Sequence, residues 1–556
     1  METENRDSAG TTSYLAAKTI PLLDLKKRPA RLTRRDRLTV VDQAIRLLEE
    51  SYVHLPQKRA MYGVDPPQRL KVLRHHIERM PKLPDDLTFH SEMLEIFNQL
   101  RDLHTNYLLP RPYRDRVACL PFDMEEYFDG DPKNPPHFMV TWVDEGVPHH
   151  KEFANGVEVL YWNGVDIRRA IELNGAREAG GNPDARYHRG LNSMTVRPLV
   201  RTLPPEEEWV SLRYRDRNNR KRNEEFKWLV YRQRPRRSAE GQAEGTGQSL
   251  DFSFDIQGAR IQEFRKDMMS KTFKPDKLTK PAFKTIFRTC YRDMSGRPAE
   301  TPKGNFGHIR IFTFMHPDAE KFAKEFERLL GLMQDTRGLI IDVRRNGGGN
   351  IQASERLLRL ISPSKIRPIG FQFINSPLTL DLCRRNAKFK VWESSISQSV
   401  MTGDVQSRSF PITSEKDCNA RRQVYTGPVV LIVDPLCYSA TDIFAASFKD
   451  HGIGKILGTS PKTGAGGANV WTYSLLRELS EGTPSFDRFC DLPAGVEMRV
   501  AIRRCLRGQN QSGIPVEDLG VEADCIHLMT RRDVLEYNQD LLRHAVCILT
   551  GKPYVP

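Results

Sequence analysis

The stretch 427–467 constrains the fold of this chain most, because it changes from a strand pattern to a helix pattern within a few residues. Residues 428–433 form an apolar, mostly β-branched run of the kind that fills a strand buried on both faces, and Asp434-Pro435 ends it. Apolar residues then recur at helical spacing after Ser439, which places this serine at the strand-to-helix junction. The free N–H groups of the first helical turn would suit an oxyanion there.

Two interpretations of Ser439 stay open on these residues alone. Ser439-x-x-Asp442 is a capping-box pattern, and most serines at the start of a helix only cap it. In the second interpretation the hydroxyl is an exposed nucleophile that faces the helix N-terminus.

The same stretch resembles the catalytic block of the C-terminal-processing (tail-specific) serine peptidases, whose relatives include the tricorn core and the chlamydial protease-like activity factor. The matching features are the strand, the Ser439-to-Asp442 turn, the following helix, the strand 455–458 and a Gly-rich loop. The resemblance implies that Ser439 is the nucleophile. Tail-specific members use a loop lysine as the base, but residues 463–467 contain none and Lys462 is offset. We therefore expect the Ser/His/Glu arrangement of the tricorn and chlamydial branch.

That arrangement requires a histidine and an acid elsewhere in the chain. Residues 101–107 contain a D-x-H-T turn similar to the one before the inserted domain of the family, and His104 matches the base. Residues 513–521 resemble the closing G-x-x-x-E-x-x-G-V segment, which implies that Glu517 is the acid, with Asp518 as the fallback. Without the resemblance, a histidine after a helix and a carboxylate in a loop would be interpreted as surface or capping residues.

Residues 344–350, Arg-Arg-Asn-Gly-Gly-Gly-Asn, follow a predicted buried strand and precede a predicted helix. The loop lacks the nucleotide-binding patterns G-K-[ST] and G-x-G-x-x-G. The resemblance implies an oxyanion loop, with Gly347 or Gly348 and the Ala440 N–H as donors, each contributing about 3 kcal/mol to the transition state. The alternative is that the glycines only form a tight turn.

The predicted fold class is α/β, and the resemblance implies a crotonase/ClpP-like ββα-repeat catalytic core. We expect a flexible arm (1–35), a helical region (36–118), a PDZ-like β-rich domain (119–235), a linker or insert (236–303) and the serine peptidase core (304–556). Residues 157–167 follow the pattern V-x-V-L-x-x-N-G-x-x-I, which resembles a PDZ-like module. No clean copy of a carboxylate-binding loop is found in it.

Charge and composition narrow the class of protein. The net charge is +14, but the basic residues are dispersed and no basic helix is interleaved with aromatics, so nucleic acid is not expected. Nine cysteines without paired short spacing argue against a disulfide framework and a zinc site. The chain starts without a signal-peptide pattern and has no apolar run of membrane-spanning length, which predicts a soluble cytoplasmic protein.

The sequence therefore predicts a serine endopeptidase that uses Ser439, His104 and Glu517, with no metal or organic cofactor. Its expected partner is a protein or peptide substrate, without nucleic acid or membrane, and a homo-oligomer is allowed. The missing loop lysine keeps open a catalytically silent scaffold of the same fold that binds peptide or lipid. A crotonase-like thioester enzyme is a third hypothesis, which the PDZ-like insert disfavours.

Overall fold

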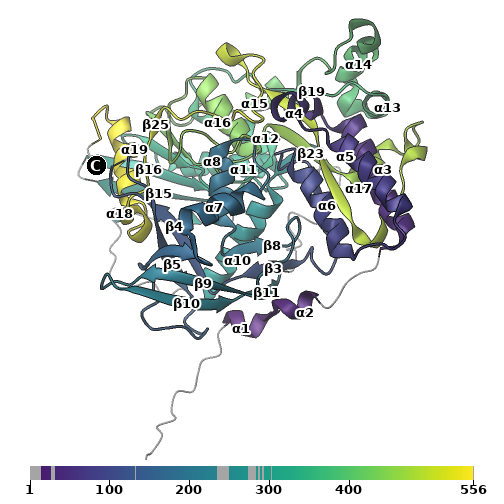
Figure 1. Ribbon diagram of the computed structural model, residues 1–556. Coiled ribbons are helices and arrows are strands. Elements are labelled where there is room, and N and C mark those ends of the chain that lie inside the picture. Colours follow the sequence, from purple (N-terminus) through teal and green to yellow (C-terminus); the bar gives the residue numbers. More distant parts are fainter. Residues whose placement is uncertain are drawn as a thin grey trace, which may run out of the picture.

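A mixed sheet with parallel central strands organises the C-terminal half of the chain in this computed structural model (Figure 1). The structure describes residues 14–26, 32–131, 133–233, 250–272, 284–285, 289–290, 293–301 and 303–554. The low-complexity stretch 234–249 lies outside them. The sheet order is β13-β15-β16-β17-β21-β22-β25, with β14 beside β15. The bounds are β13 Lys284–Thr285, β14 Thr289–Cys290, β15 Met294–Thr301, β16 Gly304–Ile311, β17 Leu339–Asp342, β21 Val429–Val433, β22 Lys455–Gly458 and β25 Cys525–Ile526.

Helices cover both faces of this sheet, which explains why β21 is apolar at every position. Leu431 and Val433 belong to the main core, with helices α11 Ala319–Gly331, α12 Ile351–Ile361 and α16 Ala440–Asp450. Val430 and Ile432 point the other way and pack in a second cluster with α19 Gln539–Leu549. The short α18 Arg531–Leu535 precedes α19. The predicted strand and the helix after Ser439 are thus confirmed.

A second sheet joins the N-terminal helices to the core. The long strand β24 Glu497–Leu506 pairs with β2 Asn106–Leu108, β19 Gly370–Phe373 and β23 Ala468–Thr472, and β20 Phe410–Pro411 extends β19. Because β2 pairs with β24, the turn just before β2, which carries His104, lies against the catalytic core.

Four helices make up most of the expected helical region. They are α3 Arg34–Ser51, α4 Leu55–Tyr62, α5 Pro66–Arg79 and α6 Asp86–Asn98. Thr33 and Asp36 form a capping box at the start of α3, and its apolar face, which includes Val40 and Leu47, is buried. The remaining helices are α13 Pro377–Arg385, α14 Lys390–Thr402, α15 Glu415–Cys418, α17 Tyr473–Ser480 and the short turns η2 Ala387–Phe389, η3 Phe486–Arg488, η4 Pro493–Gly495 and η5 Gln509–Gln511.

The β-rich region between them consists of two small sheets (Figure 1). In one, β10 Lys221–Lys227, β9 Trp209–Arg215, β6 Glu158–Trp162, β5 His137–Val143 and β4 Phe122–Tyr127 pair in that order, with β7 Val165–Asp166 beside β6. Asn163 and Gly164 both have positive φ, as the predicted Asn-Gly turn requires. The other sheet is β1 Thr19–Pro21, β11 Leu229–Arg232, β3 Arg116–Cys119 and β8 Val196–Pro198, and the helices are α7 Ile167–Ala176 and α8 Pro183–Asn192.

Two segments differ from their predicted description. The described part of the expected flexible arm forms α1 Tyr14–Lys18, β1 and α2 Leu22–Lys26, and β1 pairs with β11. Leu15, Leu22 and Leu25 are buried, so apolar contact fixes the segment to the β-rich region. The expected linker contains β12 Phe252–Phe254 and α10 Ile256–Thr272, and β12 pairs with β18 Gly348–Asn350. Across the described ranges, the structure has no helix that combines the length and hydropathy needed to cross a bilayer.

Candidate active site

Ser439 stands between β21 and α16, as the N-cap residue of the helix. Its φ of 66° lies in the left-handed region, which is strained for a residue with a side chain and is a feature of serines on sharp strand-to-helix turns. The Ser439 N–H donates to Asp442 Oδ2 at 2.9 Å, whereas its hydroxyl donates to Ser253 Oγ. The backbone of Ser439 is therefore capped, and the hydroxyl is directed elsewhere.

Asp442 ties the nucleophile turn to the glycine loop that follows β22. Besides the Ser439 N–H, its carboxylate accepts the Gly466 N–H at 2.9 Å and the Thr463 hydroxyl. Burial raises the pKa of Asp442 to about 7, against the opposing effect of these donors. The sequence suggested only a helix cap at this position, because the loop residues that complete the network are distant in the chain.

His104 is held in the turn between α6 and β2. Asp102 Oδ1 accepts the His104 backbone N–H at 2.7 Å, and the imidazole lies 4.6 Å from the Tyr438 ring, centroid to centroid. Burial lowers the pKa of His104 to about 3, more than the Asp102 carboxylate raises it. The imidazole is consequently neutral near pH 7, the form that can accept a proton.

The hydroxyl of Ser253 connects the two predicted catalytic residues. Ser253 Oγ lies 3.0 Å from His104 Nε2 and accepts the hydrogen bond from Ser439. The structure thus brings His104 and Ser439 to the same oxygen atom, although they lie in distant parts of the sequence. Nothing in the sequence pointed to Ser253, which lies in the segment expected to be a linker.

The strand that carries Ser253 fills a groove beside the glycine loop. Strand β12 pairs antiparallel with β18, with Ser253 opposite Gly349. The Leu250 carbonyl, at the entrance to β12, accepts hydrogen bonds from Asn469 Nδ2 at 2.9 Å, Trp471 Nε1 at 3.1 Å and Arg503 at 3.2 Å. An extended backbone is therefore bound along its length next to Ser439.

The predicted oxyanion loop lies directly against the nucleophile. A Cβ on Gly348 would stand 2.7 Å from the Ser439 Cβ and 2.6 Å from the Ser253 carbonyl oxygen, so only glycine allows this approach. The Gly348 N–H donates to Asn346 Oδ1 at 3.0 Å, and the Gly347 carbonyl accepts the Asp255 N–H at 2.9 Å. Ala440, the third predicted member, is the buried first residue of α16.

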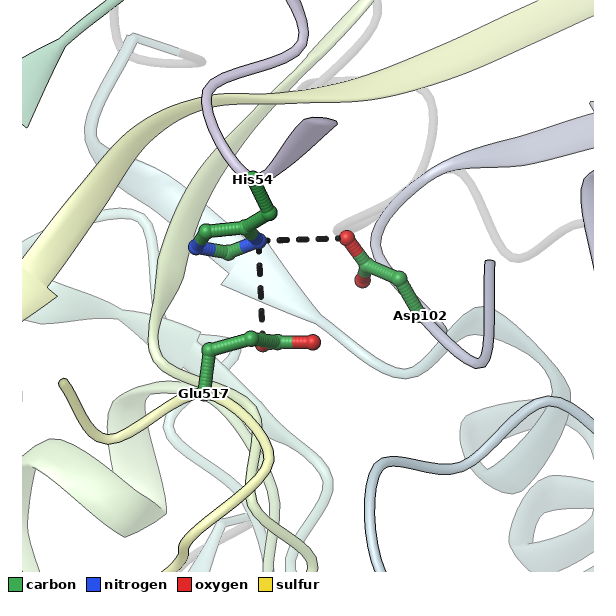
Figure 2. Close-up of side chains that lie close together, drawn as sticks. All are labelled: His54, Asp102 and Glu517. Carbon is green, nitrogen blue, oxygen red and sulfur yellow. Dashed lines mark hydrogen bonds and ion pairs between the residues drawn. The ribbon is translucent and has the colours of Figure 1, made fainter. Parts of the chain in front are cut away.

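Glu517 lies in a fully buried cluster with residues of the N-terminal region (Figure 2). The Lys58 ammonium donates to Glu517 Oε1 at 2.7 Å and to Asp518 Oδ1 at 2.6 Å, and the Gly467 N–H donates to Glu517 Oε2 at 3.3 Å. Within the described part of the chain, the hydrogen bonds of the Glu517 carboxylate are made with these groups and not with His104.

His54 completes the cluster around Glu517. Its Nδ1 lies 3.3 Å from Asp102 Oδ2 and 3.9 Å from Glu517 Oε2 (Figure 2). One ligand atom from each of these three residues lies within 4.8 Å of the others, a spacing that could hold a metal ion. The Lys58 ammonium already supplies the positive charge here, so the cation of this cluster belongs to the chain itself.

Lys462, the offset lysine beside the glycine loop, lies at the surface and not in the buried site of Ser439. Its ammonium lies 3.5 Å from Glu522, and the two side chains are 35% and 70% exposed. Ser439 is fully buried. This is the geometry of a surface ion pair, which contributes little energy.

Comparisons with known proteins identify the domains that carry this geometry. Residues 305–525 match the model of peptidase family S41, and residues 116–236 match a PDZ domain. The chain thus contains a peptidase family S41 domain and a PDZ domain. It is therefore a serine-type peptidase, a hydrolase whose substrates are proteins or peptides.

Solved structures agree with the fold. The crystal structure of mature CPAF matches with a TM-score of 0.66 at 16% identity, covering 94% of this chain and 99% of that one. A complex of mature CPAF with lactacystin matches with a TM-score of 0.63, at 16% identity, over 93% and 99% of the two chains. These similarities concern the fold alone. A search of curated proteins finds no match.

Proposed function

We propose that this S41 member is a serine endopeptidase with a crotonase-like core, in which Ser439 is the nucleophile, His104 the general base and Glu517 the acid. The observation that carries the proposal is the contact of His104 Nε2 and Ser439 Oγ with the same Ser253 hydroxyl. A nucleophile and its base must lie within hydrogen-bond reach, directly or after a small adjustment. Removal of the Ser253 hydroxyl would leave the two groups facing each other.

The chemistry follows from these positions. His104 accepts the proton of the Ser439 hydroxyl as Ser439 Oγ attacks the peptide carbonyl, and it later protonates the leaving amine. The N–H groups of Gly347 or Gly348 and of Ala440 stabilise the oxyanion of the tetrahedral intermediate. Water then releases the acyl group from Ser439 by the same steps. We assign to Glu517 the stabilisation of the positive charge that His104 gains.

A fluorophosphonate probe tests the nucleophile assignment directly. We expect the wild-type protein to be labelled covalently and the Ser439→Ala variant not to be labelled, because the probe reacts with an activated serine hydroxyl. Peptide mapping of the labelled protein should find the adduct on Ser439. Labelling that persists in Ser439→Ala, or that maps to Ser253, would contradict the assignment.

Peptide hydrolysis also requires strand β12 to leave the groove. The Ser253 carbonyl occupies the space beside Gly348 and Ser439, where the carbonyl of a substrate would react. A substrate strand would take the place of β12 and pair with β18 in the same antiparallel register. The rate of reaction then depends on the fraction of molecules in which β12 is displaced.

A charge placed on β12 should therefore speed the reaction with the probe. Phe252 is only 7% exposed, so Phe252→Asp buries an unpaired carboxylate and disfavours the bound strand. We expect fluorophosphonate labelling to be at least about tenfold faster than in wild type, a factor that matches a shift of one to two kcal/mol. The control is Val400→Asp on α14, where the side chain is 92% exposed. Equal rates in all three proteins would show that β12 does not gate the site.

The silent peptide-binding scaffold is supported by one specific observation. The groove already binds an extended strand, and the Ser253 hydroxyl stands between the presumed nucleophile and its base. A protein that holds this arrangement permanently would bind but not cleave. The two functions are separated by the labelling experiment with Phe252→Asp: a displaced β12 with an unreactive Ser439 would favour the scaffold.

A further inference from the structure

Helix α4 brings two side chains of the N-terminal region into the active-site cluster. His54 is the N-cap residue of α4, and Lys58 lies four residues later, so both point from the same face. The helix is fixed at both ends, by Pro56 in its first turn and by Gly63 in the left-handed conformation at its C-cap. The position of Lys58 is therefore set by the backbone and not by a mobile surface loop.

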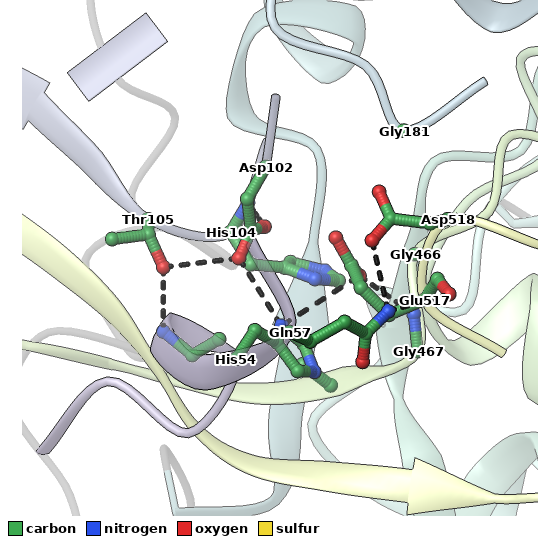
Figure 3. Close-up of polar contacts among 12 residues, drawn as sticks. His54, Gln57, Asp102, His104, Thr105, Gly181, Gly466, Gly467, Glu517 and Asp518 are labelled. Carbon is green, nitrogen blue, oxygen red and sulfur yellow. Dashed lines mark hydrogen bonds and ion pairs between the residues drawn. The ribbon is translucent and has the colours of Figure 1, made fainter. Parts of the chain in front are cut away.

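Lys58 is fully buried, and it donates to two carboxylates of the C-terminal segment. It contacts Glu517 at 2.7 Å and Asp518 at 2.6 Å. Asp518 is held further by Gln57 Nε2 at 2.9 Å (Figure 3). It also accepts a hydrogen bond from the Tyr62 hydroxyl at 2.8 Å, and both donors belong to α4. One short helix thus supplies three donors to the two consecutive acids.

The charge balance makes this lysine necessary. Glu517, Asp518 and Asp102 are three carboxylates in a buried cluster, and Lys58 is a permanent cation among them. Removing one partner of a buried ion pair leaves an uncompensated charge, which is strongly unfavourable. Besides Lys58, several ionisable groups interact electrostatically with Glu517. They include Tyr52, His54, Asp102, Tyr438, Cys505 and Asp518.

The pKa directions agree with this geometry. Burial alone would lower the pKa of Lys58, but Glu517 and Asp518 raise it above its usual value. Lys58 therefore stays an ammonium and cannot serve as a general base. Burial and the Asp102 carboxylate raise the pKa of Glu517, and Lys58 opposes them. Without Lys58, Glu517 would take up a proton at a higher pH than in wild type.

Glu517 is also connected to the nucleophile through the glycine loop. Its Oε2 accepts the Gly467 N–H at 3.3 Å (Figure 3). The adjacent Gly466 N–H donates to Asp442, which also accepts the Ser439 N–H. A change in the charge or position of Glu517 would therefore act on the loop that supports Ser439.

We propose that Lys58 is a positioning residue of the active site, which opposes the protonation of Glu517 and fixes it against the glycine loop. The proposal rests on the proposed function, because that function assigns Glu517 the role of the acid. It makes the N-terminal helical region part of the catalytic unit, not only a packing element. Lys58 itself does not touch the reacting atoms.

The first test is the pH dependence of kcat in Lys58→Met. We expect kcat at pH 7 to fall at least about tenfold and to recover as the pH rises, because Glu517 regains its charge at high pH. KM should stay close to the wild-type value. In the Glu517→Gln background, Lys58→Met should lower kcat no further, since the carboxylate whose protonation Lys58 opposes is absent and Asp518 keeps its Gln57 and Tyr62 donors. The control Lys71→Met removes an exposed ammonium that pairs with Glu49 on the surface.

The second test does not need activity. Glu517 with a raised folded pKa binds a proton more tightly in the folded state than in the unfolded state, so stability is lost as pH rises above the unfolded pKa of about 4.3. The Tm deficit of Lys58→Met relative to wild type should therefore widen between pH 5 and pH 8 in this window. The deficit should lose its pH dependence when Glu517→Gln is added.

The activity and Tm measurements distinguish the proposed function from the positioning role of Lys58. A wild type that neither hydrolyses peptide nor reacts with the probe would refute the proposed function. The pH-dependent Tm would still decide whether Lys58 opposes the protonation of Glu517. A pH-independent Tm deficit, or an equal loss of kcat with and without Glu517→Gln, would overturn the positioning role. If Lys58→Met alone does not fold, Lys58→Met/Glu517→Gln should fold, because it removes the ammonium and the Glu517 carboxylate and leaves Asp518 with its Gln57 and Tyr62 donors. Its failure to fold would also overturn the proposal.

Discussion

Replacing His104 by alanine should lower kcat about a thousandfold, in line with the loss of a general base. The structure gives the reason: His104 Nε2 and Ser439 Oγ reach the same hydroxyl, and the buried imidazole is neutral near pH 7. Steady-state hydrolysis of a peptide and the rate of fluorophosphonate labelling should both show the loss. Wild-type activity should fall only on the acid side, as the imidazole becomes protonated.

While β12 fills the groove, burial lowers the pKa of His104 to about 3. We therefore expect the loss of activity at acid pH to occur below the usual imidazole pKa of about 6.5. A lysine base would instead give activity that rises at higher pH. Lys462→Ala should therefore leave kcat within about threefold of wild type, as expected for a surface ion pair. His90→Ala is the matched control, because His90 is also buried but hydrogen-bonds Tyr107 in the helical region. A His104→Ala protein with nearly full activity would refute the assignment.

Sequence patterns predicted the parts of the fold that depend on interactions between residues close together in the chain. The run 428–433 is apolar at every position, which alone predicts a strand buried on both faces. In the structure its alternate side chains face two different clusters. The Asn163-Gly164 turn and the buried face of α3 follow from backbone preference and helical spacing in the same way. The crotonase-like description and the domain boundaries rest on family resemblance and stay predictions.

The active site could be predicted only where a residue carries a local motif. Ser439 and Gly348 lie in such motifs, and His104 and Glu517 were reached through the resemblance. Lys58 and Ser253 carry no local signal, since an isolated lysine on a short helix and a serine in an expected linker are common surface features. Their roles come from long-range packing of α4 on the C-terminal loop and of β12 on β18. Such pairings have no trace in sequence spacing.

The glycine loop distinguishes an enzyme from a binding scaffold. A methyl group at Gly348 would meet the Ser439 Cβ at 2.7 Å and the Tyr438 carbonyl oxygen at 2.8 Å, and the φ of 103° is strained for any other residue. Gly348→Ala should therefore displace the nucleophile and the oxyanion donors together. We expect kcat to fall by at least about a hundredfold, the effect of losing one oxyanion donor.

The decisive measurement is kcat in a protein shown by its thermal transition to be folded, alongside peptide affinity in Ser439→Ala. Gly331→Ala on α11 is the control, because a Cβ there would have no atom within 4 Å. It should keep the wild-type rate, since alanine suits a helix better than glycine. A Gly348→Ala enzyme with full kcat would remove the loop from the mechanism. An oxyanion donor acts on the transition state, whereas the wall of a binding groove acts on the bound ground state. If wild type shows no hydrolysis and Gly348→Ala only weakens peptide binding, the groove is therefore a binding site.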